Sequence, residues 1–360
     1  MTTGQSGKEG IDVRNRCAYL DRNHKINIIS EDMPEIGADQ VLVNIVANGI
    51  CGSDVHFYRE GRLGNYVVEE PYIPGHECSG IICGVGGEAA GWKEGDRVVI
   101  EPGIPCGRCE MCRTGRYNQC RSVVFLSEPG TNGTFCDYVA VRYDAVYKIP
   151  DHLEMDIAAL AEPAAVAVHA VNRCGGVAGK TGVILGAGPI GLLTIQAFKA
   201  AGGAKVIAAD INEKRLQLAG RLGADEVIDL SRSDANLENL GECVIETAGS
   251  PKTTEQLYRI AKSAGVVVQV GWPKGNIVPM DIACFIEKEL DYRAVNRYAN
   301  AFPTALAWLA DGRINGKMMI THRFDFEETE EAFRFTAANP SEVIKTIVSN
   351  RMRGEEQRLK

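Results

Sequence analysis

The feature that most constrains the fold is a regular alternation of short apolar segments and helix-forming segments in the second half of the chain. The segments GVILGA, KVIAAD, EVIDL, CVIETAG and GVVVQVG predict strands. Helices are predicted between them at about 189–201, 213–222 and 252–263. Parallel strands require such crossovers, so this region predicts an α/β fold with a doubly wound parallel sheet.

A glycine-rich turn, GAGPIG, follows the first of these strands and opens a helix. Glycines allow the backbone to turn tightly and to approach a pyrophosphate, which then lies at the helix N-terminus. The pattern alone is weak, but its strand–turn–helix setting is the one that a dinucleotide site requires. The residues expected to contact the cofactor are Gly186, Gly188, Pro189, Ile190 and Gly191.

Asp210 ends the strand KVIAAD, nineteen residues after Gly191. A carboxylate there accepts hydrogen bonds from the ribose hydroxyls of the cofactor and repels a 2′-phosphate, by about 1–4 kcal/mol for unit charges some 4 Å apart. The sequence therefore favours NAD over NADP. Arg215 is expected either to flank the adenine or to be a solvated helix charge. The alternative reading is a glycine turn with an incidental surface aspartate.

Four cysteines crowd into the stretch EPGIPCGRCEMCRTGRYNQC, residues 101–120, with the spacing C-x2-C-x2-C-x7-C. Such spacing lets Cys106, Cys109, Cys112 and Cys120 converge on one tetrahedral zinc ion. An iron–sulfur cluster and a set of buried free thiols are the alternatives. A structural zinc would stabilise its loop by about 10–16 kcal/mol, as in zinc-finger peptides. Four protein ligands leave no open position, so catalysis is expected elsewhere.

The length and net charge of the chain limit its domain number and the kinds of partner that it can bind. The 360 residues suffice for about two domains, and the net charge of −8 argues against nucleic acid as a partner. The start of the chain, MTTGQSGKEG, is too polar for a signal peptide, and no apolar run reaches the roughly 18 residues of a membrane span. We expect a cytoplasmic protein in a reducing compartment, where disulfides are rare.

A third constellation lies in GICGSDVHFYREG and PGHE. Cys51, His76 and Glu77 offer three ligands, which leaves a position open for substrate, as in catalytic zinc sites. Residues 25 apart in sequence need not meet, and a buried Cys and His in a core are the alternative reading.

Together, GHE, the four-cysteine loop, GAGPIG, NRYANAF and ITHRF resemble the zinc-dependent medium-chain alcohol dehydrogenases. CGSDVHFYREGRLGN and THRF resemble the polyol branch, the sorbitol and xylitol dehydrogenases, and the likeness runs from about residue 15 to 348. It implies a discontinuous, mainly β GroES-like catalytic domain at 1–155 and 291–360, a Rossmann domain at 156–290, and a homotetramer or, less often, a dimer. It also implies NAD and both catalytic and structural zinc.

The resemblance implies that Cys51 and His76 bind the catalytic zinc and that Glu77 matches a further ligand. Glu162 matches a glutamate that binds zinc or holds a water molecule beside it, and an unpaired charge in its apolar helix would be costly. The alternative is a surface glutamate at a helix start. Asp54 is expected to accept the other ring N–H of His76 or to cap a helix.

The same resemblance assigns a proton path to Ser53 and His56, by which the hydroxyl proton of the substrate leaves while a hydride passes to NAD. A helix N-cap is the alternative for Ser53. The residues expected to line the substrate pocket or bind the hydroxyl groups are Phe57, Tyr58, Phe125, Arg297 and Tyr298. Arg297 in an ordinary salt bridge is the alternative for that residue.

One segment departs from the family. The chain reads SEPGTNG at 127–133, where the family usually has an ATPP-like segment. Glu128 favours an amino-bearing substrate if it faces the pocket and has no role if it faces solvent. The four-cysteine loop, which many animal sorbitol enzymes lack, suggests a microbial-type enzyme.

The leading hypothesis is an NAD-linked polyol oxidoreductase. The same chemistry on threonine, butanediol or an aminocyclitol is the nearer alternative. A non-enzymatic, crystallin-like member is the distant one, and the retained ligands Cys51, His76, Glu77 and Glu162 argue against it.

Overall fold

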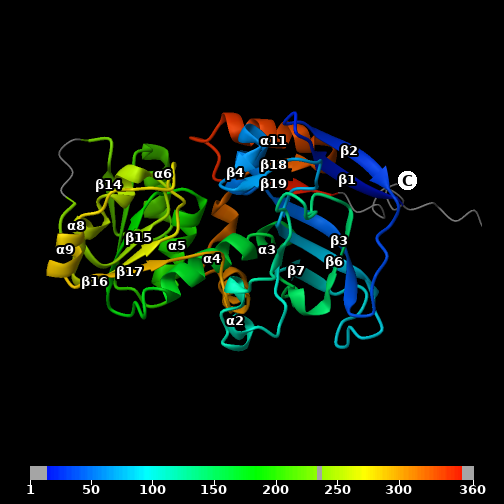
Figure 1. Ribbon diagram of the computed structural model, residues 1–360, viewed down its shortest axis with the longest axis horizontal. Helices are drawn as coiled ribbons and strands as arrows, with labels where there is room; N and C mark the ends of the chain where they lie inside the picture. Colours follow the sequence, from blue (N-terminus) through cyan, green and yellow to red (C-terminus); the bar gives the residue numbers. More distant parts are fainter. Residues whose placement is uncertain (1–13, 233–236, 351–360) are drawn as a thin grey trace, which may run out of the picture.

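The computed structural model describes residues 14–232 and 237–350 and contains two large sheets with helices between and around them (Figure 1). The polar start of the chain lies outside the described residues. Within the described part, no helix combines the length and apolarity needed to cross a membrane.

The first large sheet has six parallel strands in the order β14-β13-β12-β15-β16-β17. This order, with helices packed on the sheet, confirms the predicted α/β class. Its strands are β12 (Thr181–Leu185), β13 (Lys205–Asp210), β14 (Glu226–Asp229), β15 (Gly241–Glu246), β16 (Ala261–Gln269) and β17 (Asp291–Ala294). Its helices are α5 (Pro189–Ala200), α6 (Glu213–Arg221), α7 (Pro251–Thr254), α8 (Leu257–Ile260) and α9 (Ile282–Glu287).

One expectation for this region was wrong in detail. The predicted helix over 252–263 is two short helices, because the chain leaves α8 at Ala261 and enters β16 at once. Strand β17 adds four residues to the parallel sheet beyond residue 290, where the domain boundary is predicted.

The second large sheet is mixed and joins strands from both ends of the described chain. Its order is β11-β7-β6-β3-β19-β18, with β10 also paired to β3. Because β19 pairs antiparallel with β3, the last strand lies beside one from the start of the chain. Its strands are β3 (Gln40–Gly49), β6 (Glu77–Val85), β7 (Arg97–Ile100), β10 (Tyr138–Arg142), β11 (Val146–Lys148), β18 (Ile320–Asp325) and β19 (Lys345–Ser349).

Smaller elements surround this sheet. Strand pairs are β1 (Asn15–Leu20) with β2 (Ile26–Glu31), β4 (Arg62–Leu63) with β5 (Tyr66–Val67), and β8 (Gly103–Ile104) with β9 (Val124–Phe125). The helices are α1 (Gly52–Glu60), α2 (Glu110–Arg113) and α11 (Thr329–Ala338).

Helices α3 (Met155–Ala158), α4 (Ala161–Asn172) and α10 (Phe302–Ala310) lie between the two sheets, where α4 packs on α5 and α10 (Figure 1). The alanine-rich stretch at 155–171, expected as one helix, is therefore broken near Leu160. The physical reason is Pro163, which lacks an N–H and is tolerated only in a first helical turn.

The core of the mixed-sheet half is built around aromatic contacts. Phe333 of α11 is fully buried, and its ring meets that of Phe135 edge-on at 5.2 Å between centroids. Edge-to-face pairs add to the free energy gained from burial, so α11 is fixed over the sheet.

Phe333→Ala should lower the free energy of unfolding by about 3–5 kcal/mol, because it leaves a cavity in this core. The check is the calorimetric melting temperature, with Tyr66→Ala as control, since Tyr66 is 43% exposed. An equal melting temperature for both variants would contradict this assignment of the core.

Candidate active site

The GAGPIG turn is shaped by close backbone packing. Gly186 has φ 93°, and a Cβ on Gly191 would lie 1.8 Å from the carbonyl oxygen of Gly186, so neither position accepts a side chain. At Gly188 a Cβ would meet only the Arg215 guanidinium, at 3.7 Å. Pro189 begins α5, and Ile190 follows it in the first turn. Gly188 thus leaves open space at a helix N-terminus, where a pyrophosphate fits.

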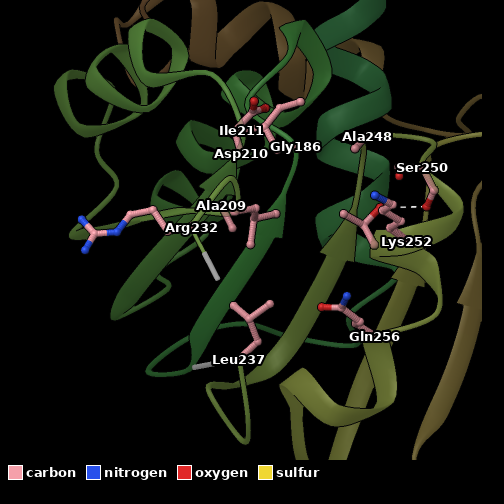
Figure 2. Close-up of a pocket in the computed structure, with 12 residues that line it drawn as sticks. Gly186, Ala209, Asp210, Ile211, Arg232, Leu237, Ala248, Ser250, Lys252 and Gln256 are labelled. Atoms are coloured by element: carbon pink, nitrogen blue, oxygen red, sulfur yellow. Dashed lines mark hydrogen bonds between the residues drawn. The ribbon is translucent and has the colours of Figure 1, made fainter. Parts of the chain in front are cut away.

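A pocket of about 440 Å³ adjoins this turn (Figure 2). Asp210 borders it at the end of β13, and its carboxylate accepts hydrogen bonds from the backbone N–H groups of Ala187 (2.6 Å) and Asn212 (2.8 Å). The remaining lining residues are Gly186, Ala209, Ile211, Leu230, Arg232, Leu237, Ala248, Ser250, Lys252, Thr253 and Gln256. The pocket lies where strands of a parallel sheet end, the usual place for an adenosine.

Arg215 lies beside the turn, but its side chain donates to the carbonyl oxygen of Pro340. This contact links α6 to the segment before β19. The expected place of Arg215 beside the adenine stays a prediction.

Cys51, His76 and Glu77 meet at the junction of the two halves. Cys51 is the N-cap residue of α1, and Glu77 begins β6. Their ligand atoms, with one from His76, all lie within 4.8 Å of one another. The pairing of Gly49 with Glu77 in the β3–β6 ladder brings them together, and Gly49 leaves room for the Glu77 carboxylate.

Asp54 makes the expected capping contact, but it forms no hydrogen bond with His76. Its carboxylate accepts from the backbone N–H of Cys51 at 3.0 Å, a first-turn capping interaction, and from the hydroxyl of Ser127 at 3.0 Å. It also lies 3.8 Å from Nδ1 of His76, a buried atom without a hydrogen-bond partner among the described residues. The other ring nitrogen remains for a metal.

Sequence reasoning missed Lys345. Its ammonium group donates to both carboxylate oxygens of Glu77, at 2.7 and 2.6 Å, and to the carbonyl oxygen of Ile50. Both side chains are buried. A lysine within the apolar segment VIKTIVS was the available signal, because a buried charge requires a partner.

Glu162 lies near these groups at the start of α4. Burial raises its pKa to about 7, which His76 partly offsets. Tyr298 is buried beside it, and its hydroxyl has no hydrogen-bond partner among the described residues; burial and the Glu162 carboxylate raise the pKa of that phenol. Burial lowers the pKa of His76, but Cys51 and Asp54 outweigh it and leave that pKa well above its usual value.

This donor set fits a divalent cation. Cys51, Glu77 and Glu162 bring three acidic groups to a buried place that Lys345 alone does not balance. A thiol, an imidazole and a carboxylate within ligating reach are the donors of catalytic zinc sites.

A cleft of about 850 Å³ opens next to these residues, between the two halves. Ser53 and His56 line it from α1, and His56 is exposed, 3.7 Å from Glu60. Ser53 is not the N-cap, a position that Cys51 holds. The facing wall comes from the parallel-sheet half and contains Thr247, Ala248, Gly249, Gly271, Trp272, Pro273, Lys274, Gly275 and Asn276.

Two expected pocket residues point into the core instead. Phe57 is buried and meets Tyr72 edge-on, at 6.1 Å between centroids. Tyr58 donates from its hydroxyl to Glu330 at 2.9 Å and packs on Phe333. These contacts give no support to the expected pocket roles.

Phe125 and Arg297 do lie beside the metal residues. The Phe125 ring is 5.4 Å from the His76 ring, and the Arg297 guanidinium lies over Phe125 at 4.3 Å. Arg297 also forms a salt bridge with Glu128. Arg297 therefore forms the ordinary salt bridge that was the alternative expectation for it. Glu128 is its partner and is only partly exposed to solvent.

The four loop cysteines gather into a second cluster. The sulfurs of Cys106, Cys109, Cys112 and Cys120 lie within 4.8 Å of one another, and two of the separations are 3.4 and 3.9 Å. Zn–S bonds of about 2.3 Å in a tetrahedron place sulfurs about 3.8 Å apart. Backbone N–H groups of Arg108 and Cys109 lower the pKa of Cys106 to about 6, which favours the thiolate. The spacing fits one zinc ion, whereas the several iron atoms of a cluster need more room.

Comparison with known proteins agrees with this geometry. Residues 37–151 match the alcohol dehydrogenase GroES-like domain, and residues 189–311 match the zinc-binding dehydrogenase family. Sorbitol dehydrogenase of Bacillus subtilis is 38% identical over 92% of this chain and 96% of its own. L-idonate 5-dehydrogenase of Vitis vinifera is 37% identical over 95% and 96%.

Among solved structures, an Escherichia coli oxidoreductase of unknown specificity superposes with a TM-score of 0.89, at 33% identity, over 94% of this chain and all of that one. The two family models cover parts of both halves of the molecule, and the matched range 37–151 contains both cysteine-containing sites described above. The chain therefore belongs to the zinc-dependent medium-chain alcohol dehydrogenases, with a GroES-like domain and a zinc-binding dehydrogenase domain.

Proposed function

We propose that the protein is an NAD-dependent polyol dehydrogenase that oxidises a secondary alcohol of the sorbitol or xylitol type to a ketose. The observation that carries the proposal is the convergence of Cys51, His76 and Glu77 beside a cleft bordered by the dinucleotide-binding half. Sorbitol dehydrogenase as a close relative supports the substrate class. One hydride leaves the carbinol carbon for NAD, the hydroxyl proton leaves for solvent, and the products are ketose, NADH and a proton.

Cys51, His76 and Glu77 would hold the catalytic zinc, with Glu162 beside them. Zinc in such a site supplies Lewis acidity, which lowers the pKa of an alcohol as it does that of water. Lys345 donates to both carboxylate oxygens of Glu77 and thereby orients that side chain. Glu162 can take or return a proton because its pKa lies at about 7.

Ser53 and His56 would carry the hydroxyl proton outward, since both line the cleft and His56 is exposed. Arg297 and Tyr298 would bind hydroxyl groups of the polyol, and Phe125 would form a wall of the pocket. The NAD-binding set would be Asp210, which accepts from the ribose, with the turn of Gly186, Gly188, Pro189, Ile190 and Gly191.

An aminocyclitol substrate is less well supported than a polyol. The argument for it was a free Glu128 carboxylate in the pocket, but Glu128 is paired with Arg297. No comparable contact favours threonine or butanediol among the described residues.

The protein is further proposed to be a cytoplasmic homotetramer or dimer. Strand β17 lies at the end of the parallel sheet, and apolar side chains beside it are exposed, including Ile282 (61%) and Ile286 (72%). Exposed apolar residues at a sheet edge support association with a second copy. Analytical ultracentrifugation measures the mass of the assembly and so the number of chains in it.

The test of the reaction is NADH absorbance with purified protein, NAD and a panel of sorbitol, xylitol, ribitol, galactitol, threonine, butanediol and an aminocyclitol. Each is run with and without a zinc chelator. Chelator-sensitive turnover of a polyol is expected. Activity only on a non-polyol would retain the zinc chemistry and overturn the substrate class.

Cys51→Ala should reduce kcat/KM for the polyol by at least about 100-fold, since a Lewis acid contributes several kcal/mol to the transition state. Zinc measured by mass spectrometry should fall from two ions per chain to one, while NADH still binds. Cys83→Ala, at an exposed strand position, is the matched control. Unchanged turnover in Cys51→Ala would refute the zinc mechanism.

Cys112→Ser should also remove one zinc ion, but from the loop, and should lower the melting temperature because metal binding stabilises that loop. The catalytic ion and the Cys51–His76 site should remain. Zinc content and scanning calorimetry measure the two effects. An iron signal in place of zinc would favour the cluster reading.

Asp210→Asn should raise KM for NAD about 10-fold or more and reduce the preference over NADP, because a charged acceptor of ribose hydroxyls becomes neutral. Steady-state kinetics with both cofactors provide the comparison, and Glu213→Gln, on α6, is the control. A preference for NAD that survives the change would show that another group makes the choice.

A further inference from the structure

We infer that Glu128 sets the charge preference of the substrate site. By pairing with Arg297, it selects uncharged polyols and disfavours polyhydroxy acids. The inference rests on the proposed function and deepens it, because it assigns specificity to a residue outside the metal and cofactor sites.

The pair is connected to the metal site through the ring of Phe125. The Arg297 guanidinium lies 4.3 Å over the Phe125 ring, which in turn lies 5.4 Å from the ring of His76. The side chains of Arg297 and Glu128 are 18% and 26% exposed, so both are partly withdrawn from solvent without being sealed off. A ligand that reaches His76 past Phe125 therefore encounters the ion pair.

Both backbones are held in place. Ser127, just before Glu128, is buried in a left-handed conformation with φ 73°. Its hydroxyl donates to Asp54 at 3.0 Å and accepts from the backbone N–H of Gly75 at 2.8 Å. Arg297 is likewise left-handed, with φ 57°, next to the buried Tyr298. Non-glycine residues rarely adopt this conformation, which marks both positions as constrained.

The charges determine what the site accepts. A free guanidinium matches a carboxylate with two parallel hydrogen bonds, so an unpaired Arg297 would attract the acid end of an aldonate. With Glu128 in place, such a substrate must either displace the Glu128 carboxylate from Arg297 or place its own carboxylate beside it on the same guanidinium. Guanidinium has five N–H donors, so hydroxyl groups can bind to those that Glu128 does not occupy.

The same logic weakens recognition of an ammonium group, because Glu128 is already neutralised. Relatives of similar identity are named for a neutral polyol and for an acid, sorbitol and L-idonate. Charge selection is thus a property in which similar chains differ, and this chain carries a residue positioned to make the choice.

The test compares sorbitol with D-gluconate, which has a carboxylate at one end of a similar six-carbon chain, in the wild type and Glu128→Gln. Gluconate is assayed as a competitive inhibitor of sorbitol oxidation and by calorimetric titration of the protein–NADH complex. Glu128→Gln should tighten gluconate binding about 10–100-fold, the worth of a charge-assisted hydrogen bond, and change KM for sorbitol by less than about 3-fold.

Glu327→Gln is the matched control, since it breaks a salt bridge with Arg16 elsewhere on the surface. Glu128→Ala is the second variant if the first does not fold. Equal gluconate affinity in the wild type and both Glu128 variants would overturn the inference, as would wild-type binding of gluconate as tight as that of sorbitol. If no polyol is oxidised, the proposed function fails, but the calorimetric comparison still decides the role of Glu128.

Discussion

The buried ion pair between Lys345 and Glu77 is the contact on which the arrangement of the site depends. It joins the first residue of β19 to the first residue of β6, which are 268 positions apart in the sequence. Two buried charges are tolerated only when they satisfy each other, so each fixes the position of the other. The last strand of the described chain is thereby fixed beneath the residues that would hold zinc.

The charged groups around this pair must neutralise one another because they are buried. Cys51, Glu77 and Glu162 are acidic groups near one another, and burial raises the pKa of Glu162. A divalent cation together with Lys345 would offset such a cluster, and Arg297 and Glu128 neutralise each other in a salt bridge.

Features that depend on neighbouring residues in the sequence were predictable from it. The alternation of strands and helices gave the parallel sheet, and the spacing of Cys106, Cys109, Cys112 and Cys120 anticipated their cluster. Contacts between distant segments were not predictable. Glu128 and Arg297 are 169 positions apart, and only the folded loops show that they meet. The inward turn of Phe57 and Tyr58 depends on the rotation of α1, which no motif records.

The central claim is that Cys51, His76 and Glu77 form a zinc site at the junction of the two halves. Anomalous diffraction at the zinc edge, from crystals of the zinc-loaded protein, tests it most directly. We expect two peaks per chain, one among the four loop cysteines and one about 2.3 Å from the sulfur of Cys51 and within bonding reach of His76. A single peak at the loop, with Glu77 still bound only to Lys345, would contradict it.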